Sequence, residues 1–146
     1  MLETGTKAPD FELLDENSKP TTLAQFASSF VVLYFYPKDD TAGCTAEACA
    51  IRDSYGEFAK AGIVVLGVSK DTPESHRAFK DKYGLPFTLL SDPEEKIIEA
   101  YGAKGFPLSK RITYIINPEG VIVKTYPNVD PAGHAAQILA DIKILK

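Results

Sequence analysis

The sequence predicts an α/β fold in which helices cover a central mixed β-sheet. Two continuous apolar runs, FVVLYFY at residues 30–36 and IVVLGVS at residues 63–69, have the β-branched and aromatic composition of strands that are buried on both faces. Helical segments of about ten or more residues alternate with the strands, which is typical of βαβ units. Residues 111–126 indicate two further strands joined by a turn at residues 117–120, and this closing hairpin makes the sheet mixed.

The N-terminal half is expected to contain a hairpin, a buried strand and one long helix. Residues 11–14 and 20–23 flank a polar turn, and this pattern predicts an N-terminal β-hairpin. The apolar strand at residues 30–36 follows, and the loop PKDDTAG then leads into a helix predicted over residues 44–60. Gly62 ends this helix, since glycine is common just beyond a helix C-terminus.

The C-terminal half continues the alternation of helices and strands. Pro73 opens a helix that Gly84 ends, and a short strand, FTLL, begins at Phe87. A further helix is predicted over residues 93–101. Residues 131–145 have the spacing of an amphipathic helix that closes the chain.

The composition is that of one globular domain. The chain has 146 residues, of which 45% are apolar and 25% are charged, and it contains no internal repeat or linker, so we expect a single domain over residues 1–146. The net charge of −4 and the scattered basic residues argue against a nucleic-acid partner or an anionic membrane surface. The N-terminus lacks the basic start and the apolar stretch of a secretory signal, which predicts a cytoplasmic location where thiols stay reduced.

The chain has only two cysteines, Cys44 and Cys49, and both lie at the start of the predicted helix. On a helical wheel, Cys44 shares the apolar stripe of Ala48 and Ile51, whereas Cys49 is rotated by about 140° toward the polar side. In an intact helix the two Cα atoms are about 8.6 Å apart. A disulfide requires less than about 7 Å, so a bridge between the two cysteines requires the helix to unwind.

The position of Cys44 allows two interpretations. Unpaired N–H groups and the dipole at a helix start favour an anion, which raises the fraction of nucleophilic thiolate. Alternatively, Cys44 is a small buried apolar residue, and the same interpretation is open for Cys49. No metal is expected, because His76 and His134 complete no ligand spacing with the cysteines and are expected on helix surfaces. The charges at residues 38–40 are expected in a solvated loop.

The stretch YFYPKDDTAGCTAEACAIRD closely resembles the active-site segment of the peroxiredoxins, most of all the bacterioferritin comigratory protein or peroxiredoxin Q subfamily. The shared pattern is a proline, three residues, a threonine, two residues and the reactive cysteine, matched here by Pro37, Thr41 and Cys44. Members with a second cysteine five positions on match Cys49. One departure is Ala42, where members often have proline.

The similarity extends over nearly the whole chain. It includes APDF near the start, VLGVSKD, FTLLSD, Arg111 at the opening of a strand, and AGH near the end. It implies a thioredoxin-like fold and a thiol-dependent peroxidase that needs no cofactor. Cys44 is implied as the peroxidatic nucleophile, and Cys49 as the resolving residue that forms an intramolecular disulfide with it.

The resemblance also implies supporting roles around the sulfur of Cys44. The Thr41 hydroxyl and the backbone N–H groups of Gly43 and Cys44 are expected to bind the peroxide, and Pro37 to shield the sulfur. Arg111 is expected to favour the thiolate and to stabilise charge that spreads over both oxygens. Taken singly, Thr41 is equally a helix-capping residue, Arg111 a strand-edge charge and Pro37 a strand terminator.

The expected substrates are hydrogen peroxide and organic hydroperoxides, with a thioredoxin-like protein as reductant and a monomer, or a dimer, as the assembly. Two other functions stay open at this point. One is a thioredoxin-fold redox sensor or binding module that relays oxidation to a partner, which turnover with a reductant would distinguish. The other is a metal chaperone, which needs a tighter cysteine pair and a suitably placed histidine.

Overall fold

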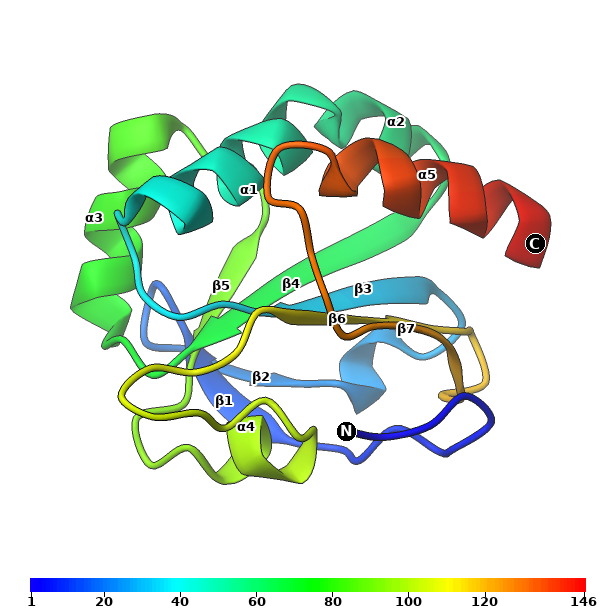
Figure 1. The fold of residues 1–146 in the computed structure, drawn as a ribbon, viewed down its shortest axis with the longest axis horizontal. Helices are drawn as coiled ribbons and strands as arrows, with labels where there is room; N and C mark the ends of the chain where they lie inside the picture. Colours follow the sequence, from blue (N-terminus) through cyan, green and yellow to red (C-terminus); the bar gives the residue numbers. More distant parts are fainter.

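The computed structural model describes residues 1–146, and Figure 1 shows a mixed sheet with helices on both of its faces. Seven strands follow the order β2-β1-β5-β4-β3-β6-β7 across the sheet. The strands are β1 Glu12–Asp15, β2 Pro20–Thr22, β3 Phe30–Phe35, β4 Ile63–Ser69, β5 Thr88–Ser91, β6 Ile112–Ile116 and β7 Ile122–Tyr126. The helices are η1 Ala24–Phe26, α1 Ala42–Asp53, α2 Tyr55–Lys60, α3 Pro73–Tyr83, α4 Lys96–Ala100 and α5 His134–Leu145.

The central strand β3 determines which loops meet at one edge of the sheet. It pairs in parallel with β4 and antiparallel with β6, so that Phe35 at its end lies opposite Ile112 at the start of β6. The hairpin of β1 and β2 joins the sheet through the antiparallel pairing of β1 with β5. The α/β class, the mixed sheet and the N-terminal hairpin predicted from the sequence are confirmed.

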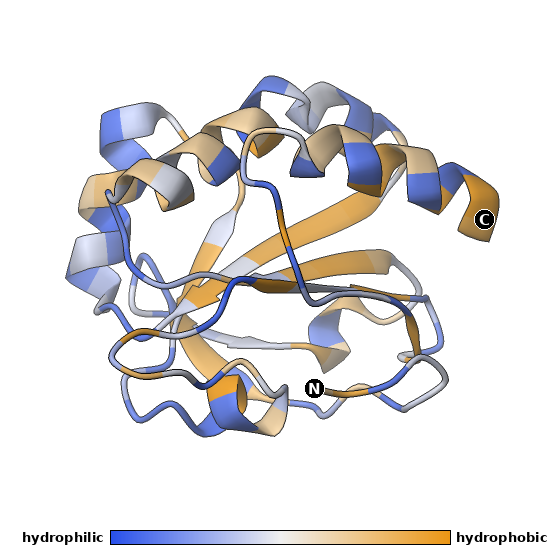
Figure 2. Cartoon of the chain, in the orientation of Figure 1, coloured by the Kyte–Doolittle hydropathy of each residue, from blue (hydrophilic) through white to orange (hydrophobic).

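The sheet separates two hydrophobic cores. In Figure 1, α1, α2, α3 and α5 lie over one face, and α4 lies over the other. Because successive side chains of a strand point to opposite faces, Val32 and Tyr34 of β3 enter the first core, whereas Val31 and Leu33 enter the second. Figure 2 shows β3 and β4 as mostly hydrophobic strands, while the helices alternate in hydropathy. None of the helices combines the length and the apolar character needed to cross a membrane.

The prediction of a single helix over residues 44–60 is wrong, because this segment forms two helices. α1 begins two residues earlier, at Ala42, and ends at Asp53, and Ser54 separates it from α2. Ser54 has φ −102° and ψ 5°, and its N–H is shared between the carbonyls of Ala50 and Ile51. The last turn of α1 is thus tightened, and serine has little intrinsic preference to continue a helix.

Two other helices are shorter than predicted. The helix expected over residues 93–101 is restricted to α4, because the Asp92 carboxylate accepts the N–H groups of residues 96–98 at 3.2, 2.9 and 2.7 Å and so sets its start. Glu95, before this start, has a positive φ of 58°. The closing helix begins at His134 rather than at Pro131.

Candidate active site

Cys44 lies in the first turn of α1, where the chain leaves β3. Its residue is 2% exposed, so the thiol is sheltered from bulk water. The first hydrogen bond of the helix runs from the N–H of Thr45 to the carbonyl of Thr41 (2.8 Å). The N–H groups of residues 42–44 therefore have no earlier carbonyl within the helix, and they place partial positive charge at its start.

Arg111 is brought to this sulfur by the pairing of two strands. It directly precedes β6, which runs antiparallel to β3, so it lies beside the loop that follows β3. Its Nη2 donates a hydrogen bond to Cys44 Sγ at 3.4 Å. A Cβ atom at Gly43 would lie 2.9 Å from the same Nη2, so glycine at this position allows the guanidinium to approach. The structure thus brings together three of the residues that the resemblance implied.

Glu47 completes the site, and sequence reasoning missed it. It lies one turn after Cys44, its side chain is completely buried, and its Oε1 accepts a hydrogen bond from Arg111 Nη1 at 2.8 Å. Burial raises the pKa of the Glu47 carboxyl to about 7, although its hydrogen bond with Arg111 acts in the opposite direction. The spacing of three residues from Cys44 was the available signal, because residues three apart share one helix face.

The charge of Arg111 is well supported at this position. Partial burial alone would lower its pKa, but the hydrogen bond to Cys44 and the interaction with Glu47 raise the pKa above its ordinary value. A permanent cation therefore lies against the sulfur. Such a cation favours the thiolate over the neutral thiol.

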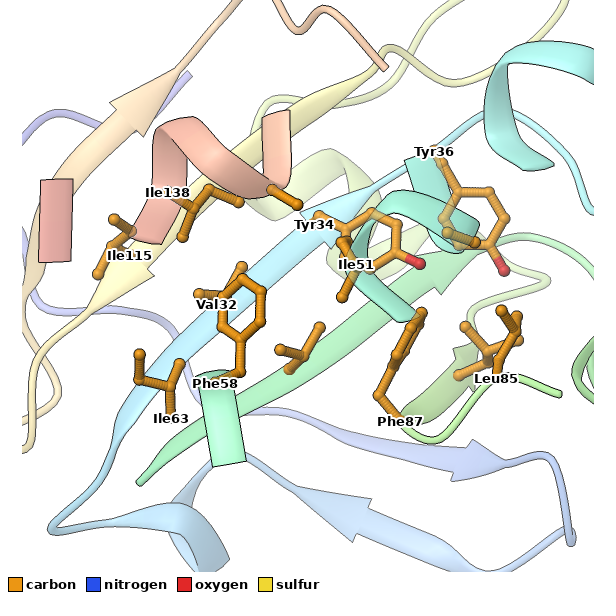
Figure 3. Close-up of a cluster of buried hydrophobic side chains, with 14 of the residues drawn as sticks. Val32, Tyr34, Tyr36, Ile51, Phe58, Ile63, Leu85, Phe87, Ile115 and Ile138 are labelled. Atoms are coloured by element: carbon orange, nitrogen blue, oxygen red, sulfur yellow. The ribbon is translucent and has the colours of Figure 1, made fainter. Parts of the chain in front are cut away.

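Two buried polar atoms near the site have no hydrogen-bond partner. They are the hydroxyl of Tyr34 and Oε2 of Glu47. Burial, and then the nearby charges of Glu47 and Cys44, raise the pKa of Tyr34 well above its ordinary value. Figure 3 shows the Tyr34 ring among the apolar side chains of the first core. A Cβ atom at Gly67 would lie 2.8 Å from this ring, so the glycine makes room for it.

No hydrogen bond joins Thr41 or Cys49 to the Cys44 sulfur in this structure. The Thr41 hydroxyl donates to the carbonyl of Lys38 at 2.9 Å, and Pro37 is half-buried two residues after the end of β3. Cys49 is partly exposed further along α1, and both cysteines are free. The two thiols thus lie within one intact helix.

The loop between β3 and α1 is anchored rather than solvated, so the expectation for residues 38–40 is wrong at Asp39. This residue is 7% exposed, and its carboxylate accepts hydrogen bonds from the hydroxyls of Tyr36 (2.6 Å) and Ser75 (2.8 Å). Its other partner is Nδ1 of His76 at 2.7 Å. Two residues of α3 and Tyr36, the residue after β3, thereby fix the loop that leads to Cys44.

The expectation that both histidines lie on helix surfaces is also wrong. His76 and His134 are completely buried, because each finds polar partners inside the fold. His134 Nε2 lies 2.8 Å from the hydroxyl oxygen of Thr113, and burial lowers the pKa of its imidazole.

One cluster has donor atoms at metal-like spacing. The ligand atoms of Asp39, Asp71 and His76 all lie within 4.8 Å of one another. The 2.7 Å between His76 Nδ1 and Asp39 Oδ2 is a direct hydrogen bond. When a cation binds two ligand atoms at metal–ligand distances of about 2.0–2.2 Å, those two atoms lie roughly 3 Å or more from each other. The arrangement therefore fits an internal polar network better than a metal centre.

Comparisons with known proteins give one consistent result. Residues 4–125 match the model of the AhpC/TSA family. The chain is 46% identical to peroxiredoxin Q of Arabidopsis thaliana, over 97% of this chain and 68% of that protein. It is 41% identical to peroxiredoxin Bcp of Bacillus subtilis, over 97% of this chain and 96% of that protein. A crystallised bacterioferritin comigratory protein of Xanthomonas campestris, described by its alkyl peroxide reduction activity, superposes with a TM-score of 0.89 at 37% identity, covering 99% of this chain and 97% of that one.

Proposed function

The chain belongs to the AhpC/TSA family of peroxiredoxins, which are thioredoxin-fold thiol peroxidases, and we propose that its peroxidase cycle begins at Cys44. The observation that carries this assignment is the guanidinium of Arg111, whose Nη2 lies 3.4 Å from the buried Cys44 sulfur. Cys49 has no hydrogen-bond partner of this kind among the side-chain contacts of the structure. Of the two thiols, Cys44 is therefore the one held in a setting that favours thiolate.

In the first step, the Cys44 thiolate attacks one oxygen of the peroxide and the O–O bond breaks. A sulfenic acid forms on Cys44, and the second oxygen takes up a proton and leaves as water or as an alcohol. Negative charge shifts from sulfur to the leaving oxygen during this step. Arg111 is positioned to stabilise that charge, because it is fixed by its ion pair with Glu47 before the reaction begins.

The peroxide is proposed to bind at the start of α1. The unpaired N–H groups of Gly43 and Cys44 point toward the beginning of the helix, where donors and the dipole favour an oxygen with partial negative charge. The Thr41 hydroxyl would join them by rotating away from the Lys38 carbonyl, to which it donates in the structure. Pro37 is proposed to shield the sulfur from water.

In the second step, the Cys49 thiol attacks the sulfenic sulfur of Cys44. The S–S bond forms and the sulfenic oxygen leaves as water, so one peroxide has consumed the two electrons of the two thiols. Both cysteines lie within α1, where helical geometry separates their Cα atoms by about 8.6 Å. The first turns of α1 must therefore unwind before the disulfide can form.

A dithiol protein of the thioredoxin type is proposed as the reductant that opens the disulfide through a mixed-disulfide intermediate. The proposed substrates are hydrogen peroxide and organic hydroperoxides, which the alkyl peroxide activity named for the Xanthomonas campestris relative supports. The same cycle favours a reducing compartment such as the cytoplasm. We propose that the chain acts as a monomer, because each step uses residues of one chain.

Two substitutions test this assignment. Cys44→Ser should abolish peroxide consumption, whereas Cys49→Ser should retain a first turnover and then accumulate over-oxidised Cys44, measured by rapid mixing with hydrogen peroxide and by mass spectrometry. Full activity of the Cys44→Ser enzyme would end the peroxidase assignment to this residue. Oxidation of both thiols without turnover, even with a dithiol reductant, would favour a redox sensor.

A further inference from the structure

Helix α3 contacts the chain on both sides of the segment that carries the two cysteines. On the N-terminal side, Asp39 is bound by Ser75 and His76 of α3. On the C-terminal side, Arg52 Nη1 donates to the carbonyl of Tyr83, the last residue of α3, at 2.7 Å. Figure 1 shows α3 beside the loop that joins β3 to α1, at the left of the view.

The N-terminal contact is buried and fully partnered. His76 Nε2 lies 3.0 Å from the carbonyl of Leu90, which can only accept, so this nitrogen carries a hydrogen. The other ring nitrogen, Nδ1, is hydrogen-bonded with the Asp39 carboxyl at 2.7 Å. The backbone of Asp39 is held as well, because its N–H donates to Asp71 at 2.9 Å. Separating Asp39 from His76 would leave buried polar atoms without hydrogen-bond partners, which destabilises the fold.

A second contact on the same side lies at the surface. Lys82 Nζ and the Tyr83 hydroxyl, both near the end of α3, donate to the Asp40 carboxylate at 2.8 and 2.7 Å. These hydrogen bonds lower the pKa of Asp40, so its charge persists in neutral solution. Asp39 and Asp40 together attach the loop to α3 at two points.

The C-terminal contact coincides with the end of α1. Arg52 lies one turn after Cys49, and its side chain is 35% exposed. Two residues later, Ser54 interrupts the helix. The part of the chain between the two attachments is therefore residues 41–51, which is α1 without its last two residues, with Thr41 at the N-cap.

We propose that the contacts of Asp39, Asp40 and Arg52 with α3 persist in both redox states and restrict the unwinding to residues 41–51. This inference rests on the proposed two-cysteine cycle. The three residues act as positioning residues, because none of them is hydrogen-bonded to either sulfur atom. The disulfide always closes the same stretch from Cys44 to Cys49, so the attachments determine how much of the neighbouring chain opens with it.

Arg52→Gln is the variant that tests the C-terminal attachment. Without it, we expect the flexible segment of the oxidised enzyme to extend through α2 to residue 60, nearly twice the length. The chain between Cys44 and Cys49 is unchanged in this variant, so the readout is the extent of hydrogen exchange in the oxidised enzyme, and the first reaction with peroxide should keep its rate. Arg52→Lys should restore most of the protection of residues 52–60.

The matched control is Arg77→Gln. Arg77 is an exposed arginine of α3 whose partners are Asn17 and Asp81, away from the cysteine segment. Its substitution should change neither the exchange pattern of the oxidised enzyme nor the first reaction with peroxide. Asp40→Asn tests the N-terminal attachment at an exposed position, where folding is not at risk, and should extend the unwinding toward residue 36.

Hydrogen exchange measured by mass spectrometry gives the direct readout, on reduced enzyme and on enzyme oxidised by diamide. We expect oxidation to accelerate exchange in residues 41–51, while residues 36–40 and 52–60 keep the protection of the reduced form. Equal acceleration over residues 36–60, or an oxidised Arg52→Gln enzyme with the same exchange pattern as the oxidised parent, would overturn the anchoring. Peroxide treatment that yields no Cys44–Cys49 bridge would instead overturn the two-cysteine cycle, and the anchoring with it.

Discussion

Cys44 and Cys49 belong to the same helix, yet their surroundings differ in nearly every physical respect. Cys44 is buried at the helix start, with a guanidinium on its sulfur and a buried carboxyl one turn away. Cys49 is partly exposed in the middle of α1. It interacts electrostatically with Arg52, whose pKa is raised first by the hydrogen bond with Asp53 and then by Cys49. In the proposed cycle, Cys44 attacks the peroxide, and Cys49 takes part only after the helix opens.

Removing the guanidinium of Arg111 should have the largest effect on the difference in reactivity between Cys44 and Cys49. Arg111→Gln keeps a polar side chain but loses the charge that favours thiolate and stabilises the leaving oxygen. We expect the reaction of Cys44 with peroxide to slow about 10²–10³-fold, the range for loss of one preorganised charge-stabilising donor. The reaction of Cys49 with a small alkylating reagent should not change. Rapid-mixing kinetics and alkylation rates measure the two effects, and equal slowing of both thiols would contradict the account.

Crowding the guanidinium of Arg111 should have an intermediate effect on the reaction of Cys44 with peroxide. Gly43→Ala places a Cβ 2.9 Å from Arg111 Nη2, so the arginine has to move away from the sulfur. A displacement of about 1 Å at a reacting centre can cost on the order of 10²-fold, and we expect at least a tenfold loss in the first step. Gly56→Ala is the matched control, since nothing lies within 4 Å of its added Cβ. If both alanine variants react like the parent enzyme, the close approach at Gly43 has no catalytic consequence.

The Glu47 carboxyl should be visible in the pH dependence of stability. Its pKa is raised from 4.5 to about 7 in the folded chain, so the folded state holds the proton more tightly than the unfolded state does. The resulting stability is complete below about pH 4.5 and is lost as the pH rises through 7. It amounts to at most about 3 kcal/mol. Urea unfolding of Glu47→Gln at pH 5 and pH 8 should show a smaller difference than the parent chain, and an equal difference would contradict a raised pKa.

The smallest effect is expected for substitution of Tyr34, and it concerns the free energy of unfolding. Its buried hydroxyl has no partner, so Tyr34→Phe removes an unsatisfied polar group from the first core. The free energy of unfolding should stay the same or increase by about 1 kcal/mol. Urea unfolding measures this change. A loss of more than about 1 kcal/mol would mean that the hydroxyl makes a contact in solution that the structure lacks.

The sequence predicted the parts of the molecule that depend on local pattern. Apolar runs identified β3 and β4, and the wheel correctly placed Cys44 with Ala48 and Ile51 on the buried face. The break at Ser54 escaped prediction, because apolar periodicity continues across it to Phe58 and nothing in the residue types requires a bend.

The site was less accessible to sequence reasoning, because its contacts join distant segments. Residue patterns alone left Arg111 as a strand-edge charge, and only the family resemblance linked it with Cys44, 67 positions away. Asp39 and His76 looked like surface residues for the same reason, since each satisfies the other only after β3 and α3 have packed together. Glu47 was missed because a carboxylate on the buried face of a helix is explained only by its partner, Arg111, which lies 64 positions away in the sequence.

The most direct test of the cycle is treatment of the reduced enzyme with one equivalent of hydrogen peroxide, followed by thiol counting and peptide mapping. We predict the loss of both thiols in a single intramolecular bridge between Cys44 and Cys49. Oxidation at Cys49 with Cys44 still reduced, or bridges only between separate chains, would contradict the assignment of the two cysteines.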